Sequence, residues 1–151
     1  MSVCCVACTE GSRQLILCLV RRCYPRPVNQ AELIQIAREL IQRRFVEGRH
    51  HIAAALRTRS GAVFTGVHIE AYVGRIAVCG EAIAIGAAAT AGDTDIETIV
   101  AVNKLGEIVS PCGMCRELIG DYSSTATVII PRGSQPVAVP IADLLPDKYQ
   151  R

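Results

Sequence analysis

The pattern of hydrophobic and polar positions becomes regular after Pro27 and first predicts a helix. Asn29 followed by Glu32 resembles a capping box, which marks the start of a helix. Beyond it, apolar residues recur at helical spacing and fall on one face, with arginines between them that can face water. Gly48 is expected to end this helix. The apolar face consists of Leu33, Ile34, Ala37, Leu40, Ile41 and Phe45.

A hairpin and a second helix are expected next. Two strand-like runs, at 52–59 and 62–69, flank Ser60-Gly61, which is typical of a β-hairpin turn. The stretch 80–91 is rich in alanine, lacks proline and is followed by Gly92, so it predicts a helix of about three turns.

The rest of the chain predicts short strands alternating with helices. A buried strand is expected at 98–103. A helix follows, with Ser110 as N-cap and Pro111 at its first position, and runs to about Tyr122. The last expected elements are strands at 126–130 and 137–140 and a closing helical turn at 141–145. The order helix, hairpin, helix, strand, helix, strand, strand indicates an α/β fold with a mixed sheet and helices packed on it.

Composition narrows the class of partner. The 151 residues are expected to form one folded domain, and half of them are hydrophobic. Sixteen basic and fourteen acidic residues give a net charge of +2, which is too weak to predict nucleic acid or a membrane as a partner. No apolar run approaches the roughly 20 residues of a membrane span.

Residues 1–27 differ in composition from residues 28–151. They are rich in cysteine and arginine, lack clear periodicity, and are expected to be an N-terminal extension without stable order. The alternative is a second metal or redox site that uses Cys4, Cys5 and Cys8. This segment does not resemble a secretory signal, so we expect a reducing, cytoplasmic location. Its five cysteines, whose role the sequence leaves open, are Cys4, Cys5, Cys8, Cys18 and Cys23.

The three remaining cysteines suggest a metal site. Cys112 and Cys115 are expected in the first turn of one helix, with both sulfurs on one side. Cys79 lies directly before the start of another helix. If the two helix starts converge, three thiolates face one point and leave the fourth position of a tetrahedral Zn²⁺ for water, as in catalytic zinc sites.

Glu81 is the candidate catalytic group. It lies two residues after Cys79 in an apolar stretch, close to the expected metal without being required as a ligand. Poor solvation would raise its pKa and suit it to move protons between water and substrate. Pro111 and Arg116 flank the Cys-x-x-Cys pair, and we expect Arg116 and the helix N-termini to offset the charge of the thiolates.

Taken alone, a Cys-x-x-Cys pair is equally typical of a redox disulfide or of half a structural zinc site. Cys-x-Glu followed later by Pro-Cys-x-x-Cys is much more specific. It is the signature of zinc deaminases of nucleobases in which three cysteines bind the metal.

Residues from about His50 to Tyr149 resemble the cytidine deaminase superfamily, and most closely its blasticidin-S deaminase-like members. The segments that carry the resemblance are "FTGVHIEAYVGRIAVCGEAIAIGAAATAG", "SPCGMCREL" and "ADLLPDKY". The resemblance implies a five-stranded sheet sandwiched by helices in residues 28–151, and a homotetramer with active sites at subunit boundaries. It also implies one zinc per subunit on the three cysteines, with hydrolytic release of ammonia from a cytosine ring while Glu81 transfers protons to N3 and to the leaving amine.

The resemblance also implies residues that contact the substrate. Family members hold the sugar hydroxyls with Asn-x-Glu, where this chain has His68-Ile69-Glu70. His50 stands where the family has an aromatic residue before the first strand, and Tyr149 is similar to the C-terminal aromatic that closes the pocket. The departures lie on the substrate side, so we expect family chemistry with altered specificity.

We therefore predict a zinc hydrolase that deaminates cytidine, deoxycytidine or a nucleoside analogue such as blasticidin S. One alternative is a zinc-stabilised nucleoside-binding protein with little or no turnover, against which the presence of Glu81 argues. Another is a redox protein, which would hold no stoichiometric zinc and would form a disulfide between Cys112 and Cys115.

Overall fold

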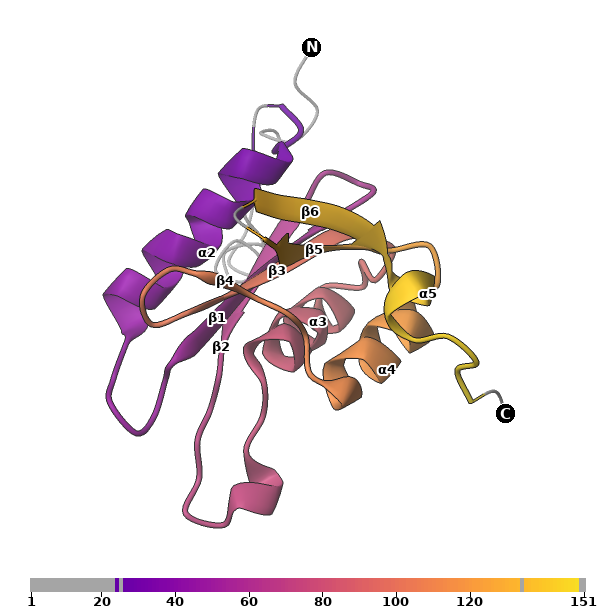
Figure 1. Cartoon of the computed structure of the whole chain (residues 1–151). Coiled ribbons are helices and arrows are strands. Elements are labelled where there is room, and N and C mark those ends of the chain that lie inside the picture. The colour runs from indigo at the N-terminus through magenta and orange to yellow at the C-terminus, as the bar shows by residue number, and fades with distance from the viewer. Residues whose placement is uncertain (1–23, 25, 134, 150–151) are drawn as a thin grey trace, which may run out of the picture.

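The computed structural model describes Tyr24, residues 26–133 and residues 135–149 (Figure 1). The extension predicted at 1–27, with the alternative site at Cys4, Cys5 and Cys8, therefore lies almost wholly outside the described residues. No helix in the described part of the chain is long and apolar enough to span a bilayer.

A mixed β-sheet forms the centre of the molecule. Its main path runs in the order β2-β1-β3-β5-β6, and a two-residue strand, β4, pairs with β3 outside this path. The neighbours are antiparallel except β3 and β5, which are parallel. The expected five-stranded sheet is thus present, with a short sixth strand. The strands are β1 (Ile52–Thr58), β2 (Val63–Val67), β3 (Ile96–Asn103), β4 (Ile108–Val109), β5 (Thr127–Arg132) and β6 (Gln135–Pro140).

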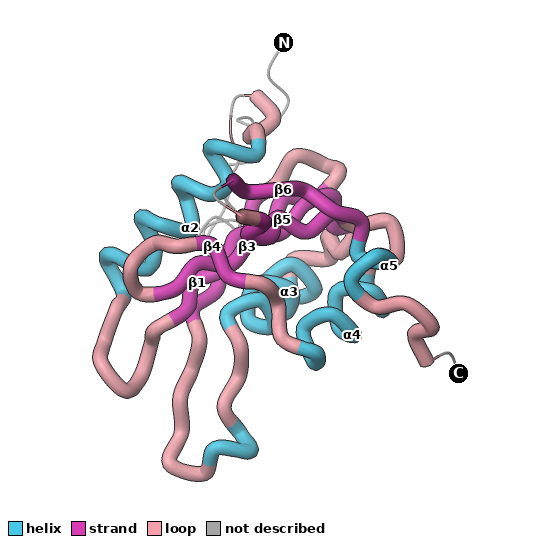
Figure 2. The backbone as a smooth tube through the Cα atoms, in the orientation of Figure 1, coloured by secondary structure: helices cyan, strands magenta, loops and turns pink. Residues whose placement is uncertain are grey.

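Helices cover both faces of the sheet (Figures 1 and 2). Helix α2 (Gln30–Arg44) packs on one face, where it shares a core with inward residues of β1 and β3. Helices α3 (Gly80–Thr90), α4 (Gly113–Tyr122) and α5 (Ile141–Leu144) pack on the other. A 3₁₀ turn, η2 (Gly74–Ile76), lies in the long connection between β2 and α3.

The predicted capping box starts α2. The backbone N–H of Glu32 donates to Asn29 Oδ1 at 3.0 Å, and the N–H of Asn29 donates to Glu32 Oε2 at 2.9 Å. The predicted end of this helix is wrong, because α2 stops at Arg44, before Phe45, which is 38% exposed. A bridge between Val46 and His50 turns the chain back, and Gly48 belongs to that turn with a φ of +69°.

The predicted start of α4 is also wrong. The helix begins at Gly113 with Cys112 as its N-cap, rather than with Ser110 as N-cap and Pro111 as first residue. The unpredicted strand β4 explains the difference: it pairs with β3 and keeps the chain extended directly before Ser110. Ser110 is also biased toward extended backbone because a proline follows it. The helix therefore starts two residues later than the Ser-Pro signal indicates.

The parallel pairing of β3 and β5 places the helix starts together. A helix precedes each of these strands, α3 before β3 and α4 before β5, and both helices pack on the same face of the sheet. Each helix runs back across the sheet relative to the strand that follows it, so α3 and α4 both begin at the same edge. This topology brings Cys79 and Cys112 to one place.

Candidate active site

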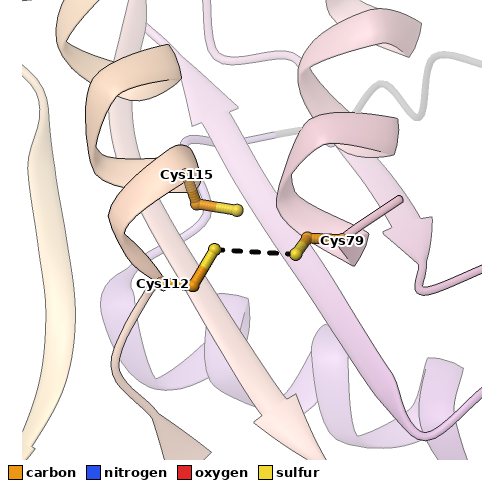
Figure 3. A group of neighbouring side chains, drawn as sticks. All are labelled: Cys79, Cys112 and Cys115. Atoms are coloured by element: carbon orange, nitrogen blue, oxygen red, sulfur yellow. Dashed lines mark hydrogen bonds between the residues drawn. The ribbon is translucent and has the colours of Figure 1, made fainter. Parts of the chain in front are cut away.

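Three cysteine sulfurs converge where α3 and α4 begin (Figure 3). Cys79 is the N-cap of α3, Cys112 is the N-cap of α4, and Cys115 is the third residue of α4. The Sγ atoms of Cys79 and Cys112 are 3.7 Å apart, and all three Sγ atoms lie within 4.8 Å of one another. We call these three residues the cysteine centre.

The cysteine centre fits a tetrahedral zinc ion. Zn–S bonds of about 2.3 Å at tetrahedral angles require sulfurs about 3.8 Å apart, close to the separation of Cys79 and Cys112. All three cysteines are free thiols, so Cys112 and Cys115 are not joined as the redox alternative requires. Among the residues that the structure describes, no fourth His, Cys, Asp or Glu joins this group. The donor set is therefore that of a site with three protein ligands and one open position.

The surroundings of the three thiols shift their pKa values in different directions. Burial, together with the neighbouring thiol and carboxyl groups, raises the pKa of Cys79 and of Cys115. Burial also acts to raise the pKa of Cys112, but the backbone N–H of Cys115 and the adjacent thiols outweigh it and lower that pKa. Two of the three sulfurs thus hold their protons more tightly than usual until a metal ion displaces them.

Glu81 lies directly beside this centre and is buried. It is the second residue of α3, and only 5% of its surface is exposed. Pro111, Ile99 and Ile119 line the same small space as its side chain. Burial in this apolar setting raises the pKa of Glu81, although hydrogen bonds from its own backbone and from Cys115 partly oppose the shift. This is the environment that the sequence predicts for a proton shuttle.

Two glycines bring the start of α3 against the sheet. A Cβ atom at Gly66 in β2 would lie 2.4 Å from the carbonyl oxygen of Gly80 and 2.5 Å from the backbone nitrogen of Ala84. Gly80 itself packs against the backbone of Ala54 in β1. A side chain at Gly66 would not fit, and one at Gly80 would require the neighbouring backbone to shift slightly, so this close approach fixes Cys79 and Glu81 relative to the strands.

Arg116 connects two segments near the cysteine centre, and its predicted effect on the charge of the thiolates stays a prediction. Its Nε donates to the carbonyl oxygen of Pro111 at 3.0 Å, and its Nη1 donates to that of Leu144 at 3.1 Å. The guanidinium therefore ties the segment before Cys112 to helix α5. These two hydrogen bonds support a positioning role for Arg116.

Three residues predicted to contact the substrate lie together, with a fourth that the sequence analysis missed. His50 Nδ1 lies 2.7 Å from the carbonyl oxygen of His68, so His50 holds the backbone of that residue. The ring of His51, which was not predicted, lies 4.2 Å from the ring of His68, and Glu70 Oε2 lies 3.7 Å from His68 Nε2. His51, His68 and Glu70 form a second group of neighbouring ligand atoms, which we call the histidine–glutamate cluster.

The histidine–glutamate cluster lies next to the cysteine centre. Ile69 pairs with Val78, so the segment from His68 to Glu70 runs beside the residues that lead into Cys79. Burial lowers the pKa of His68, and the neighbouring His51 adds to this effect. His68 therefore favours its neutral form.

Tyr149 is not brought to either group in this single chain. Its side chain is 76% exposed beyond α5. The preceding residue, Lys148, ties this segment to α4 through ion pairs to Asp121 at 2.6 Å and Glu117 at 3.3 Å. The predicted contact between Tyr149 and a substrate stays a prediction.

Comparisons with known proteins agree on one family. Residues 27–130 match the sequence model of the cytidine and deoxycytidylate deaminase zinc-binding region. A blasticidin-S deaminase from Bacillus cereus is 45% identical over 128 residues, which cover 80% of this chain and 91% of that protein. A cytidine deaminase from Mycobacterium tuberculosis is 26% identical over 67% of this chain and 74% of its own length. The crystal structure of a cytidine deaminase from Burkholderia pseudomallei superposes with a TM-score of 0.70 at 25% identity, covering 80% of this chain and 99% of that one.

Proposed function

The chain belongs to the cytidine and deoxycytidylate deaminase family, and we propose that it is a zinc-dependent hydrolase that removes the exocyclic amino group from a cytosine nucleoside or nucleoside analogue. One observation carries the proposal: three sulfurs converge at two helix N-termini beside a glutamate that is only 5% exposed. We assign Cys79, Cys112 and Cys115 as zinc ligands and Glu81 as the catalytic residue.

Glu81 carries the proton transfers in the proposed reaction. Zinc, when bound, would act as a Lewis acid that lowers the pKa of water to a value near neutral. The carboxylate of Glu81 accepts a proton from the attacking water and delivers it to N3 of the ring, and a second transfer protonates the leaving amine. Water and the cytosine ring are thereby converted into a uracil ring and ammonia. The raised pKa of Glu81 supports this role because a shuttle must both accept and release a proton near neutral pH.

The helix termini favour the charges of this site. Three thiolates and one Zn²⁺ carry a net charge of −1, and the N-terminus of a helix acts roughly as +0.5 of a charge. Cys79 and Cys112 are the N-caps of two such helices. The two helix N-termini therefore partly offset the effect of burial, which disfavours thiolates at Cys79 and Cys115.

The choice of substrate rests on the residues beside the cysteine centre and on the relatives. Glu70 is positioned to accept hydrogen bonds from a polar group of the substrate, with His68 beside it and His50 holding the backbone of His68. The identity to a blasticidin-S deaminase is 45%, against 26% to a cytidine deaminase. We therefore propose blasticidin S or a similar cytosine nucleoside analogue as the preferred substrate, with cytidine and deoxycytidine used less well.

We further propose that residues 28–151 form the catalytic domain and that four copies assemble, so that exposed residues of one subunit complete the site of another. Large apolar side chains support an assembly: Tyr72 is 99% exposed, and Val73 and Ile76 are 61% and 65% exposed, all in the connection between β2 and α3. Tyr149 is a candidate for such a shared contact.

Free thiols suit the reducing cytoplasm, where we place the protein.

The proposed function is tested by the ultraviolet absorbance change of the purified zinc-loaded protein with cytidine, deoxycytidine, methylated cytidines, free cytosine and blasticidin S. We expect stoichiometric ammonia release, with the highest kcat/KM for blasticidin S or a related analogue. Bound zinc without ammonia release from any member of the panel would contradict the proposal and favour a nucleoside-binding protein.

A further inference from the structure

The histidine–glutamate cluster presents three ligand atoms to one point, separately from the cysteine centre. Ligand atoms of His51, His68 and Glu70 all lie within 4.8 Å of one another. His51 comes from the residues just before β1, whereas His68 and Glu70 follow β2, so the hairpin that joins these strands holds the three together. The cluster is thus built by the fold rather than by chance proximity along one segment.

His68 is buried with one of its ring nitrogens unsatisfied. Only 8% of His68 is exposed. Its Nδ1 has no hydrogen-bond partner among the described residues, and its Nε2 lies 3.7 Å from Glu70 Oε2, beyond an ordinary hydrogen bond. An unsatisfied buried polar atom costs about 1–3 kcal/mol. The three side chains offer ligand atoms within 4.8 Å of one another, which is a spacing that one shared ion can bridge.

We propose that His51, His68 and Glu70 form a second site for a divalent transition metal, next to the cysteine centre. Two imidazoles and one carboxylate are ligands that suit Zn²⁺, Co²⁺ or Cu²⁺, whereas Mg²⁺ and Ca²⁺ prefer sites made of oxygen. Two neutral imidazoles, one carboxylate and a divalent ion have a net charge of +1, whereas the net charge of a zinc-loaded cysteine centre is −1. The two sites therefore attract each other electrostatically when both are filled, rather than repelling.

The two sites should fill in a fixed order. Thiolates hold zinc more tightly than imidazole and carboxylate oxygen do, and the cysteine centre lies at two helix N-termini that stabilise those thiolates. The first equivalent of metal occupies the cysteine centre, and the second, weaker equivalent occupies the histidine–glutamate cluster.

A metal in the second site inhibits the enzyme. This consequence, unlike the site itself, rests on the proposed function, in which Glu70 accepts hydrogen bonds from the substrate. An ion on Glu70 removes that acceptor, so metal beyond the first equivalent raises KM and leaves kcat nearly unchanged.

The test is to titrate cobalt into the full chain that already carries one zinc. Calorimetry measures the affinity, and the visible spectrum reports the ligands of the cobalt. Cobalt on thiolates shows an intense sulfur-to-metal charge-transfer band, whereas cobalt on imidazole and carboxylate shows only weak bands. We expect one further equivalent to bind without the charge-transfer band. The variant His51→Ala should weaken that second equivalent at least about tenfold. The control variant is Glu47→Gln. Glu47 lies on the neighbouring surface outside the cluster, so this change should leave the affinity for the second equivalent unchanged.

Two results would overturn the second site. One is a protein that binds no further ion up to saturation, and the other is a second equivalent whose affinity is the same in the parent, in His51→Ala and in Glu70→Gln. The use of two variants keeps the test valid if one of them does not fold. Failure of the proposed function is distinguishable, because a protein that releases no ammonia can still bind the second ion, and an active enzyme can lack it.

Discussion

The cysteine centre and the histidine–glutamate cluster lie side by side but are built from different parts of the fold. The cysteines belong to the first turns of α3 and α4, where backbone hydrogen bonds and packing on the sheet fix them. His51, His68 and Glu70 lie on segments that flank β1 and β2, where the regular strands have ended. In the function that we propose, the helix N-termini hold the residues that bind the metal, and the ends of the strands carry the residues that contact the substrate.

The largest effect should follow from removing a ligand of the cysteine centre. Cys112→Ala leaves two sulfurs and is expected to abolish zinc binding and activity together. Because metal binding is coupled to folding, Tm should fall by about 10 °C or more. Metal analysis and thermal unfolding measure both losses.

Met114→Ala is the matched control for Cys112→Ala. Met114 lies between the two cysteines of α4 and is 72% exposed, so its loss should leave zinc and activity nearly unchanged. A Cys112→Ala protein that is active and still binds zinc would contradict the assignment of the cysteine centre as the zinc site.

A smaller and different effect is expected in the second region. Glu70→Gln keeps the size of the side chain but removes the charge that accepts hydrogen bonds from the substrate. Hydrogen bonds to charged groups contribute about 1.5–3 kcal/mol, so kcat/KM should fall about 10- to 100-fold, with zinc content unchanged. Steady-state kinetics on the preferred substrate measure the fall, and a loss of the first zinc in this variant would show that the two regions are not separate.

The smallest effect is expected far from both regions. Asn29→Ala removes one half of the capping box of α2, which packs on the opposite face of the sheet. The loss of an N-cap costs about 1 kcal/mol, so Tm should fall by a few degrees while kcat/KM stays the same. Chemical denaturation and the activity assay check both parts, and a large change in kcat/KM would show that the two faces are coupled.

Local signals in the sequence predicted most elements of the fold. The capping box at Asn29, the turn at Ser60-Gly61 and the glycine after α3 are each decided by a few neighbouring residues, and the structure confirms all three. Phe45 and the start of α4 were predicted wrongly because backbone pairing of neighbouring segments, rather than helix signals, decides them. Val46 forms a bridge with His50, and β4 pairs with the end of β3 across a short hairpin.

The candidate site divides in the same way. The sequence indicates that Cys112 and Cys115 lie together, but the convergence of Cys79 with them was only a condition there. The structure meets this condition because the parallel pair β3 and β5, each preceded by a helix, brings the two helix starts together. The importance of His51 could not be predicted. In a strand, neighbouring residues such as His50 and His51 would point to opposite sides. Both histidines lie before β1, which begins at Ile52, and both contact His68.

The central claim is that the cysteine centre binds zinc while Glu81 performs the proton transfers. The most direct test measures zinc content and ammonia release in parallel for the parent protein and Glu81→Gln. The account predicts one zinc per chain in both proteins, with turnover reduced about 10²- to 10⁴-fold in the variant. A Glu81→Gln protein that keeps its zinc and still releases ammonia at the parent rate would contradict it.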